Sequence, residues 1–133
     1  MTVLRPKYIT FDCYGTLTWF KPGETAAPLM ADRIPAERMP AFLRDFMWYR
    51  FDEVLGAWQP YVDVLKNALE RTCKRHGVPF READGQAIYD AVPTWGPHPD
   101  VPEPLTRVGR RIPLVVLSNA MNAQIHDNVA LLQ

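Results

Sequence analysis

Two short clusters of polar residues could carry chemistry in this chain. One is Asp12 with Thr16, on either side of a turn that contains Gly15, and the other is the pair Ser118 and Asn119. A carboxylate can act as a nucleophile when neighbouring donors hold it and a substrate is placed in line with it. The hydroxyls of Thr16 and Ser118 and the backbone N–H groups of the turn are suitable donors. The residue types therefore predict a site in which Asp12 attacks an electrophilic atom.

Each cluster follows an apolar run that is typical of a buried strand. Residues Tyr8–Phe11 are β-branched and aromatic, and the four consecutive aliphatics Leu114–Leu117 indicate a strand buried on both faces, as in parallel sheets. Ligands of open α/β sheets bind outside the carboxyl ends of the strands. We therefore predict an α/β fold in which the two polar clusters meet in one crevice.

The rest of the sequence predicts helices. Apolar residues recur at three- and four-residue steps, which is the pattern of a helix with one buried face. The predicted helices cover residues 36–55 with an interruption near Phe51, 61–76, 81–92, 103–110 and a last segment along Met121, Ile125, Val129 and Leu132. Gly77 follows the second helix at a position where a left-handed residue commonly ends a helix.

Prolines and glycines divide the chain. Pro22, Gly23, Pro28 and Pro35 predict a stretch with little regular structure, and the proline-rich run 93–99 predicts a hinge. We therefore expect a partial Rossmann-like core of residues 1–20 and 97–133 and a helical cap of residues 21–96. Two strands make a very small sheet, so we expect the core to be incomplete as written.

Composition excludes several classes of protein. The 133 residues are 47% hydrophobic, which excludes an intrinsically disordered chain. The 15 basic and 15 acidic residues cancel, which argues against nucleic-acid or anionic-membrane partners. No apolar run reaches the roughly 18 residues that span a bilayer, and residues 1–6 lack the core of a signal peptide. Cys13 and Cys73 show no metal-ligand spacing, which favours a reduced, cytoplasmic protein.

The segments Phe11–Leu17 (FDCYGTL) and Leu114–Asn119 (LVVLSN) together resemble the first two motifs of the haloacid dehalogenase superfamily. The 106 positions from Asp12 to Ser118 hold a helical insertion, which is where that superfamily carries its cap. Within the superfamily the type II haloacid dehalogenases are most similar, and the helix from Tyr61 also resembles theirs. The resemblance implies a hydrolase that cleaves the carbon–halogen bond of short 2-haloalkanoic acids through an aspartyl ester.

The same resemblance implies roles for individual residues. Asp12 would be the nucleophile, and Asn119 would hold the departing halide together with an arginine of the cap. The residues that would bind the substrate and its carboxylate are Cys13, Tyr14, Thr16 and Ser118. No cofactor and no metal are implied, and the expected partners are a small carboxylate substrate and a halide, with a homodimer left open.

The cap arginine has three candidates. A match without gaps places Phe42 at the position of the family's arginine. Arg44 lies two residues further on and is our choice, with Arg50 and Arg38 as alternatives.

Two other functions compete with this interpretation. One is a phosphatase-like relative, whose subclass carries a second Asp two residues after the nucleophile, where Tyr14 stands here. An alkoxide leaving group needs the proton of that acid, whereas a halide needs none. The other is an inactive fragment or a binding module, because the family's later lysine and the later loop that positions water have no counterpart in these 133 residues.

We predict that halide release needs no magnesium, because Tyr14 removes the second carboxylate that would help to hold the ion. Chloride release from 2-chloropropionate, measured with a chelator and with added magnesium, checks this. Activity that is lost in the chelator and restored by magnesium would favour the phosphatase alternative instead.

Overall fold

The structure is a computed structural model that describes residues 5–133, and the chain forms two compact units. Residues 5–20 and 93–133 make one unit, and residues 21–92 make the other. The predicted boundary at 96/97 differs from the observed one at 92/93. The reason is that the Trp19 N–H donates to the Gly96 carbonyl at 2.9 Å and Trp95 is buried in the first unit. Of the N-terminal residues inspected for a signal peptide, 1–4 lie outside the described residues.

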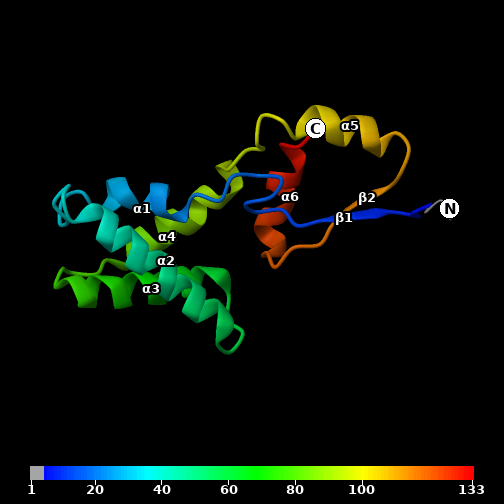
Figure 1. The fold of residues 1–133 in the computed structure, drawn as a ribbon. Coiled ribbons are helices and arrows are strands. Elements are labelled where there is room, and N and C mark those ends of the chain that lie inside the picture. Colours follow the sequence, from blue (N-terminus) through cyan, green and yellow to red (C-terminus); the bar gives the residue numbers. More distant parts are fainter. Residues whose placement is uncertain (1–4) are drawn as a thin grey trace. The chain divides into compact units, whose positions relative to one another are not determined.

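The unit of residues 21–92, here called the helical unit, contains four helices (Figure 1). These are α1 (Pro22–Met30), α2 (Met39–Leu55), α3 (Tyr61–His76) and α4 (Glu82–Ala91). The predicted end of α3 is confirmed, since Gly77 adopts φ +69° and its N–H donates to the last turn. Fully buried apolar side chains from all four helices form one core, including Ala26, Met30, Phe42, Phe46, Leu65, Leu69 and Ile88.

Two local expectations for the helical unit were wrong. Residues 22–30 form α1 rather than irregular structure, because Pro22 occupies the first turn, where its missing N–H costs nothing, and Ala26 and Met30 are fully buried. The apolar burial outweighs the hydrogen bond that Pro28 removes from the helix interior. The expected interruption of α2 near Phe51 is also absent, as the helix runs unbroken to Leu55.

Arg33, just after α1, ties several segments of the helical unit together. Its buried guanidinium donates to the carboxylate of Asp84 on α4, to the Pro79 carbonyl at 2.7 Å and to the Leu29 carbonyl at 3.0 Å. A buried charge is tolerated only when it is paired and hydrogen-bonded. The bonds therefore fix the end of α1 against α4 and the loop before it.

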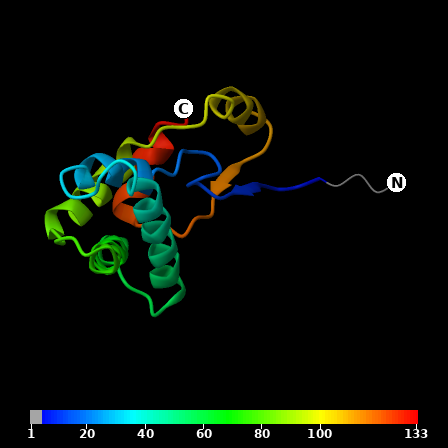
Figure 2. The same cartoon turned by 60° about the vertical axis from the view of Figure 1, so that its left-hand side comes forward.

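The other unit contains a two-stranded parallel sheet with two helices. Strand β1 (Ile9–Phe11) pairs with β2 (Leu114–Val116) in the register Ile9 to Leu114 and Phe11 to Val116. Figures 1 and 2 show the two strands side by side, with α5 (Pro102–Gly109) leading into β2 and α6 (Asn122–Ala130) following it. The short 3-10 helix η1 (Val92–Thr94) precedes this part of the chain. The predicted α/β class with a small parallel sheet and a helical insertion is confirmed.

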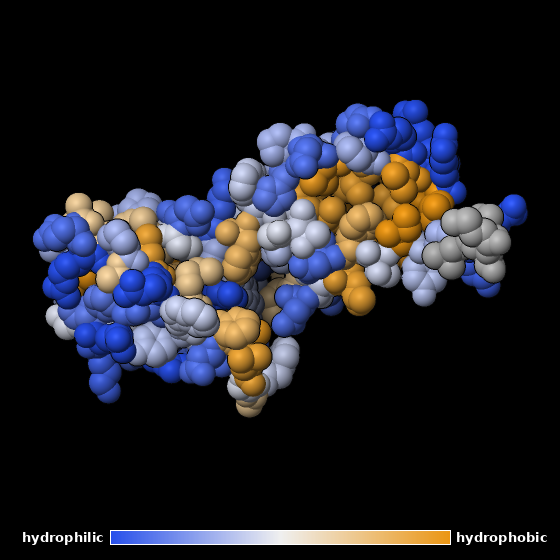
Figure 3. Space-filling view, in the orientation of Figure 1, coloured by the Kyte–Doolittle hydropathy of each residue, from blue (hydrophilic) through white to orange (hydrophobic). Residues whose placement is uncertain are grey.

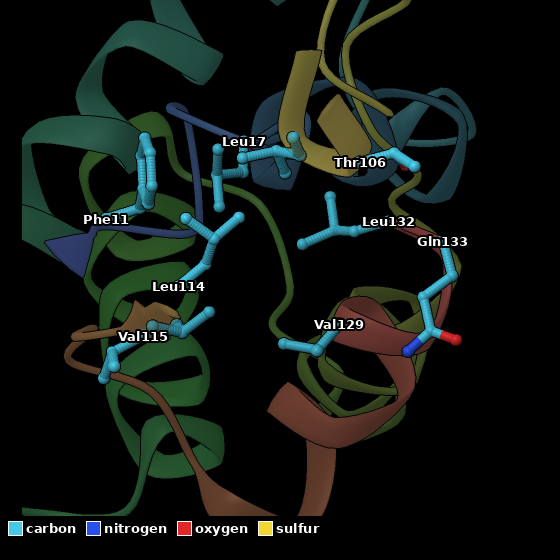
Figure 4. A pocket seen from close by; sticks show the side chains of 10 residues that line it. Phe11, Leu17, Thr106, Leu114, Val115, Val129, Leu132 and Gln133 are labelled. Atoms are coloured by element: carbon cyan, nitrogen blue, oxygen red, sulfur yellow. The ribbon is translucent and has the colours of Figure 1, made fainter. Parts of the chain in front are cut away.

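The sheet is more open than predicted. The expectation that Leu114–Leu117 is buried on both faces was wrong, because Val115 is 45% exposed and Leu117 is 71% exposed. An apolar cavity of about 500 Å³ lies between the strands, α5 and the end of α6, and its side chains are drawn in Figure 4. Figure 3 shows apolar surface over this part of the molecule. Parallel sheets normally have both faces covered, and residues 5–133 do not supply that cover.

We predict that the 133-residue protein self-associates through its sheet, because unpaired strand edges with apolar faces recruit other chains. Val115→Lys should lower the apparent molecular mass in light scattering, since a charge on a strand opposes such pairing. Leu55→Lys is the matched control, because Leu55 is 70% exposed but lies in the helical unit. A lower mass in the control alone would place the contact on the helical unit and contradict the prediction.

Candidate active site

Asp12 lies immediately after β1, at the carboxyl end of the sheet. Its carboxylate is exposed, and the Thr16 hydroxyl donates to its Oδ2 at 3.3 Å. The Leu117 N–H donates to the Phe11 carbonyl at 2.8 Å, so the two segments are still paired where both strands end. Ser118 therefore follows β2 at the same end of the sheet at which Asp12 follows β1.

The turn after Asp12 is held by main-chain hydrogen bonds. The Cys13 carbonyl accepts the N–H groups of Thr16, Leu17 and Thr18 at 3.2, 2.8 and 3.0 Å. The Gly15 N–H donates back to the Thr18 carbonyl at 2.8 Å, and Gly15 adopts φ +79°. This left-handed conformation is open to glycine at little cost, so the turn depends on the residue type at position 15.

Cys13 is completely buried and supports the turn from inside. Its side chain is fully buried, with Sγ 3.8 Å from the Thr18 hydroxyl oxygen. Burial, and to a smaller extent the charge of Asp12, raises the pKa of the Cys13 thiol above its ordinary value. A protonated, buried thiol is a poor nucleophile, and the whole residue, main chain included, is closed to solvent.

Tyr14 points its hydroxyl toward α6. The phenol donates to Asn128 Oδ1 at 2.8 Å, and Asn128 Nδ2 in turn donates to the Trp95 carbonyl at 3.1 Å. The rings of Tyr14 and Trp95 also meet edge to face, with 6.4 Å between their centroids. The phenol is therefore engaged in this network, and the part of Tyr14 beside Asp12 is its main chain.

The burial of Asn128 was not predicted from the sequence. The apolar stripe of α6 was expected to be the buried one, whereas the fully or nearly fully buried side chains of this helix are Asn128 and Gln124. Ile125 and Val129 are only half-buried. A signal existed in the four-residue spacing of Gln124 and Asn128, which places them on one face of the helix.

The second polar cluster lies between β2 and α6. Ser118 is half-buried and Asn119 is exposed, and neither is the N-cap of α6, which is Met121. Both side chains therefore belong to the loop at the sheet edge rather than to the helix end.

The three candidate arginines of the helical unit differ in their surroundings. The side chain of Arg44 is 65% exposed, with Nε 3.9 Å from Asp45 Oδ1. Arg38 donates to the His76 carbonyl at 3.0 Å, and Arg50 lies beside the buried Tyr61 hydroxyl, whose pKa is raised by burial. Phe42, the position of the match without gaps, is fully buried in the core.

None of the helices within residues 5–133 is both long enough and apolar enough to cross a membrane. No group of three or more His, Cys, Asp or Glu side chains in this range is arranged to hold a metal ion.

The fold is that of the haloacid dehalogenases with a helical cap, as the sequence resemblance predicted. An L-2-haloacid dehalogenase from Xanthobacter autotrophicus, solved with chloropropionic acid covalently bound, superposes with a TM-score of 0.68 at 20% identity and covers 93% of this chain. Another structure of the enzyme from that organism gives 0.68 at 21% identity, also over 93% of this chain. A further L-2-haloacid dehalogenase gives 0.68 at 22% identity over 94%.

The chain spans about half the length of these solved structures, namely 51%, 51% and 58% of them. At this level of identity the likeness shows the fold alone. No family profile and no curated protein sequence matches the chain.

We predict that Gly15→Ala destabilises the unit that carries Asp12 by about 1–2 kcal/mol, because a Cβ disfavours the left-handed backbone of Gly15. Gly96→Ala is the matched control, since a Cβ at Gly96 would meet no atom within 4 Å and its φ is not positive. Urea denaturation followed by Trp fluorescence measures both free energies of unfolding. Equal losses in the two variants would show that the conformation of the turn does not depend on Gly15.

Proposed function

We propose that this chain carries the nucleophile of a hydrolase that cleaves the carbon–halogen bond of short 2-haloalkanoic acids. The placement of Asp12 carries the proposal: an exposed carboxylate at the carboxyl end of a parallel strand, in a turn fixed by its own main chain. Two further facts support it. The chain has the fold of L-2-haloacid dehalogenases, and one of those structures holds covalently bound chloropropionic acid.

In the first step a carboxylate oxygen of Asp12 attacks C2 of the haloacid from the side opposite the halogen. The oxygen–carbon bond forms while the carbon–halogen bond breaks, and the bonding pair leaves with the halide. The Thr16 hydroxyl holds Oδ2, which orients the carboxylate so that Oδ1 faces the substrate. A halide is a very weak base, so this step needs no proton donor. The product is an aspartyl ester with inverted configuration at C2.

In the second step water attacks the ester carbonyl carbon of Asp12. The new bond joins the water oxygen to Cγ, and the bond breaks between Cγ and the former Asp12 oxygen that is now attached to C2. One proton of the water passes to the departing alkoxide and the other to solvent. The reaction releases a 2-hydroxy acid and regenerates the Asp12 carboxylate.

The substrate carboxylate would be held at the carboxyl ends of the strands. We assign this task to the Ser118 hydroxyl and to the main-chain N–H of Tyr14, since Cys13 is fully buried. Several N–H and O–H donors aimed at one carboxylate fix its position, and the position of C2 with it. The buried Cys13 thiol and the Tyr14 phenol, which faces Asn128, take no part in this contact.

The halide would be held by Asn119, in the loop after β2. For the arginine of the family's pattern, Arg44 remains our choice because its side chain is 65% exposed and its Nε lies 3.9 Å from the nearest carboxylate oxygen, that of Asp45. Arg38 is engaged with the His76 carbonyl, and Arg50 lies beside Tyr61, which makes both less available to an anion.

We predict that Asp12→Asn abolishes both halide release and covalent labelling by 2-chloropropionate, because an amide cannot serve as the displacing nucleophile. The fold should be unchanged, since the amide matches the carboxylate in size. Mass spectrometry of the protein after incubation with 2-chloropropionate detects the ester on the peptide that contains Asp12. Asp100→Asn is the matched control, an exposed carboxylate of the same unit outside the turn, and it should label as the unaltered protein does.

The labelling measurement separates the proposal from its alternatives. Labelling that persists in Asp12→Asn would overturn the assignment of the nucleophile. An unaltered protein that binds 2-chloropropionate without forming the ester would favour a binding module instead.

A further inference from the structure

We propose that Asn128 of α6 is a positioning residue for the turn that carries Asp12, acting through the hydroxyl of Tyr14. Its importance for catalysis rests on the proposed function. Its effect on the conformation of the turn does not, and can be measured without a substrate.

Both ends of the Asn128 amide are engaged while the side chain is fully buried. Oδ1 accepts from the Tyr14 phenol at 2.8 Å, and Nδ2 donates to the Trp95 carbonyl at 3.1 Å. A buried amide is costly unless it is hydrogen-bonded, so this position requires partners on both sides. Only a side chain with one acceptor and one donor at the same distance satisfies the Tyr14 hydroxyl and the Trp95 carbonyl together.

The network joins three segments that are far apart in the sequence. Tyr14 belongs to the turn after β1, Asn128 to α6, and Trp95 to the segment that begins the second part of this unit. The rings of Tyr14 and Trp95 also meet edge to face, so each of the three residues contacts the other two. Polar networks whose members are all satisfied make an arrangement rigid and unique.

Tyr14 is well placed to transmit this rigidity to the site. It lies between Cys13, whose carbonyl accepts three N–H groups of the turn, and Gly15 with its left-handed backbone. Tyr14 also forms an isolated parallel bridge with Thr18. Main-chain hydrogen bonds therefore hold the turn together, and the hydrogen bond of the Tyr14 hydroxyl attaches the turn to α6. Release of the phenol would leave the Tyr14 N–H, which we propose to bind the substrate carboxylate, free to move.

Amide hydrogen exchange at Leu17 and Thr18 measures the turn directly, because both N–H groups donate to the Cys13 carbonyl. We expect exchange at these two amides to be about five- to tenfold faster in Tyr14→Phe and in Asn128→Leu, the usual effect of losing one hydrogen bond. The double variant should be no faster than the faster single variant, since both changes remove the same bond. If Asn128→Leu fails to fold, Tyr14→Phe, which removes a single oxygen, still carries the test.

Val129→Ala is the matched control on the same helix. Val129 is half-buried and lines the apolar cavity, so its truncation weakens the packing of α6 without touching the Tyr14 hydroxyl. We expect amide exchange in this variant to become faster along α6 and at Leu17 and Thr18 by the same factor. The ratio of the exchange rates at Leu17 and Thr18 to those of the α6 amides therefore stays the same. A merely structural role for Asn128 would give the pattern of this control.

Two results would overturn the proposal. One is unchanged exchange at Leu17 and Thr18 in Tyr14→Phe, and the other is independent, multiplying effects of Tyr14→Phe and Asn128→Leu. The catalytic part of the proposal is tested by ester formation on Asp12 in Asn128→Leu. The rate of ester formation should fall by a larger factor than the factor by which the half-saturating concentration of 2-chloropropionate rises. Absence of any ester in the unaltered protein, with the turn loosened as expected in the variants, would contradict the proposed function and leave the positioning role standing.

Discussion

The parallel pairing of β1 with β2 is the constraint on which the site depends. Each strand has only three residues, and the ladder is extended by the Ile9 N–H on the Pro113 carbonyl and the Leu117 N–H on the Phe11 carbonyl. Asp12 and Ser118 reach the same edge only because this register aligns the two strand ends. The strands are about a hundred residues apart in sequence, so their pairing would cost much entropy if the intervening chain were a flexible loop. The apolar core of the helical unit, together with the buried Arg33, folds that chain into a compact insertion.

Main-chain groups, rather than side chains, set the local geometry of Asp12. The Cys13 carbonyl gathers three N–H donors, and Gly15 supplies the one left-handed residue that the turn needs. Two side chains of the turn have separate tasks. Thr16 contacts the carboxylate of Asp12, and Tyr14 contacts α6.

The sequence predicted the strands, the polar clusters and the fold because these signals are local. A short aliphatic run that ends in Ser-Asn or Asp-x-x-Gly contains both the strand and its functional end within a few residues. Helix α1 was missed because prolines 22 and 28 were weighed without the burial of Ala26 and Met30, which only the packed structure shows. The burial of Asn128 was missed for a similar reason. Periodicity counts apolar residues, and an amide that is buried with two partners looks the same in a sequence as one on the surface.

The choice among the cap arginines also depends on neighbours that the sequence does not show. Arg38, Arg44 and Arg50 are equivalent by residue type, and they differ only in what the fold places beside them. An arginine that donates to a carbonyl, as Arg38 does, or lies beside a buried phenol, as Arg50 does, is less available to an anion. The spacing of residues in the sequence does not show this difference.

Positions 14 and 128 constrain each other, whereas position 13 is less restricted. The Tyr14 hydroxyl donates to the fully buried amide of Asn128, so a change at either position removes the bond that joins them. Position 13 contributes a carbonyl and an N–H that any residue has, and its side chain need only be small enough to be buried and tolerate the nearby Thr18 hydroxyl. The identity of the residue beside the nucleophile is therefore a matter of packing. The residue after it is bound to a partner 114 positions away.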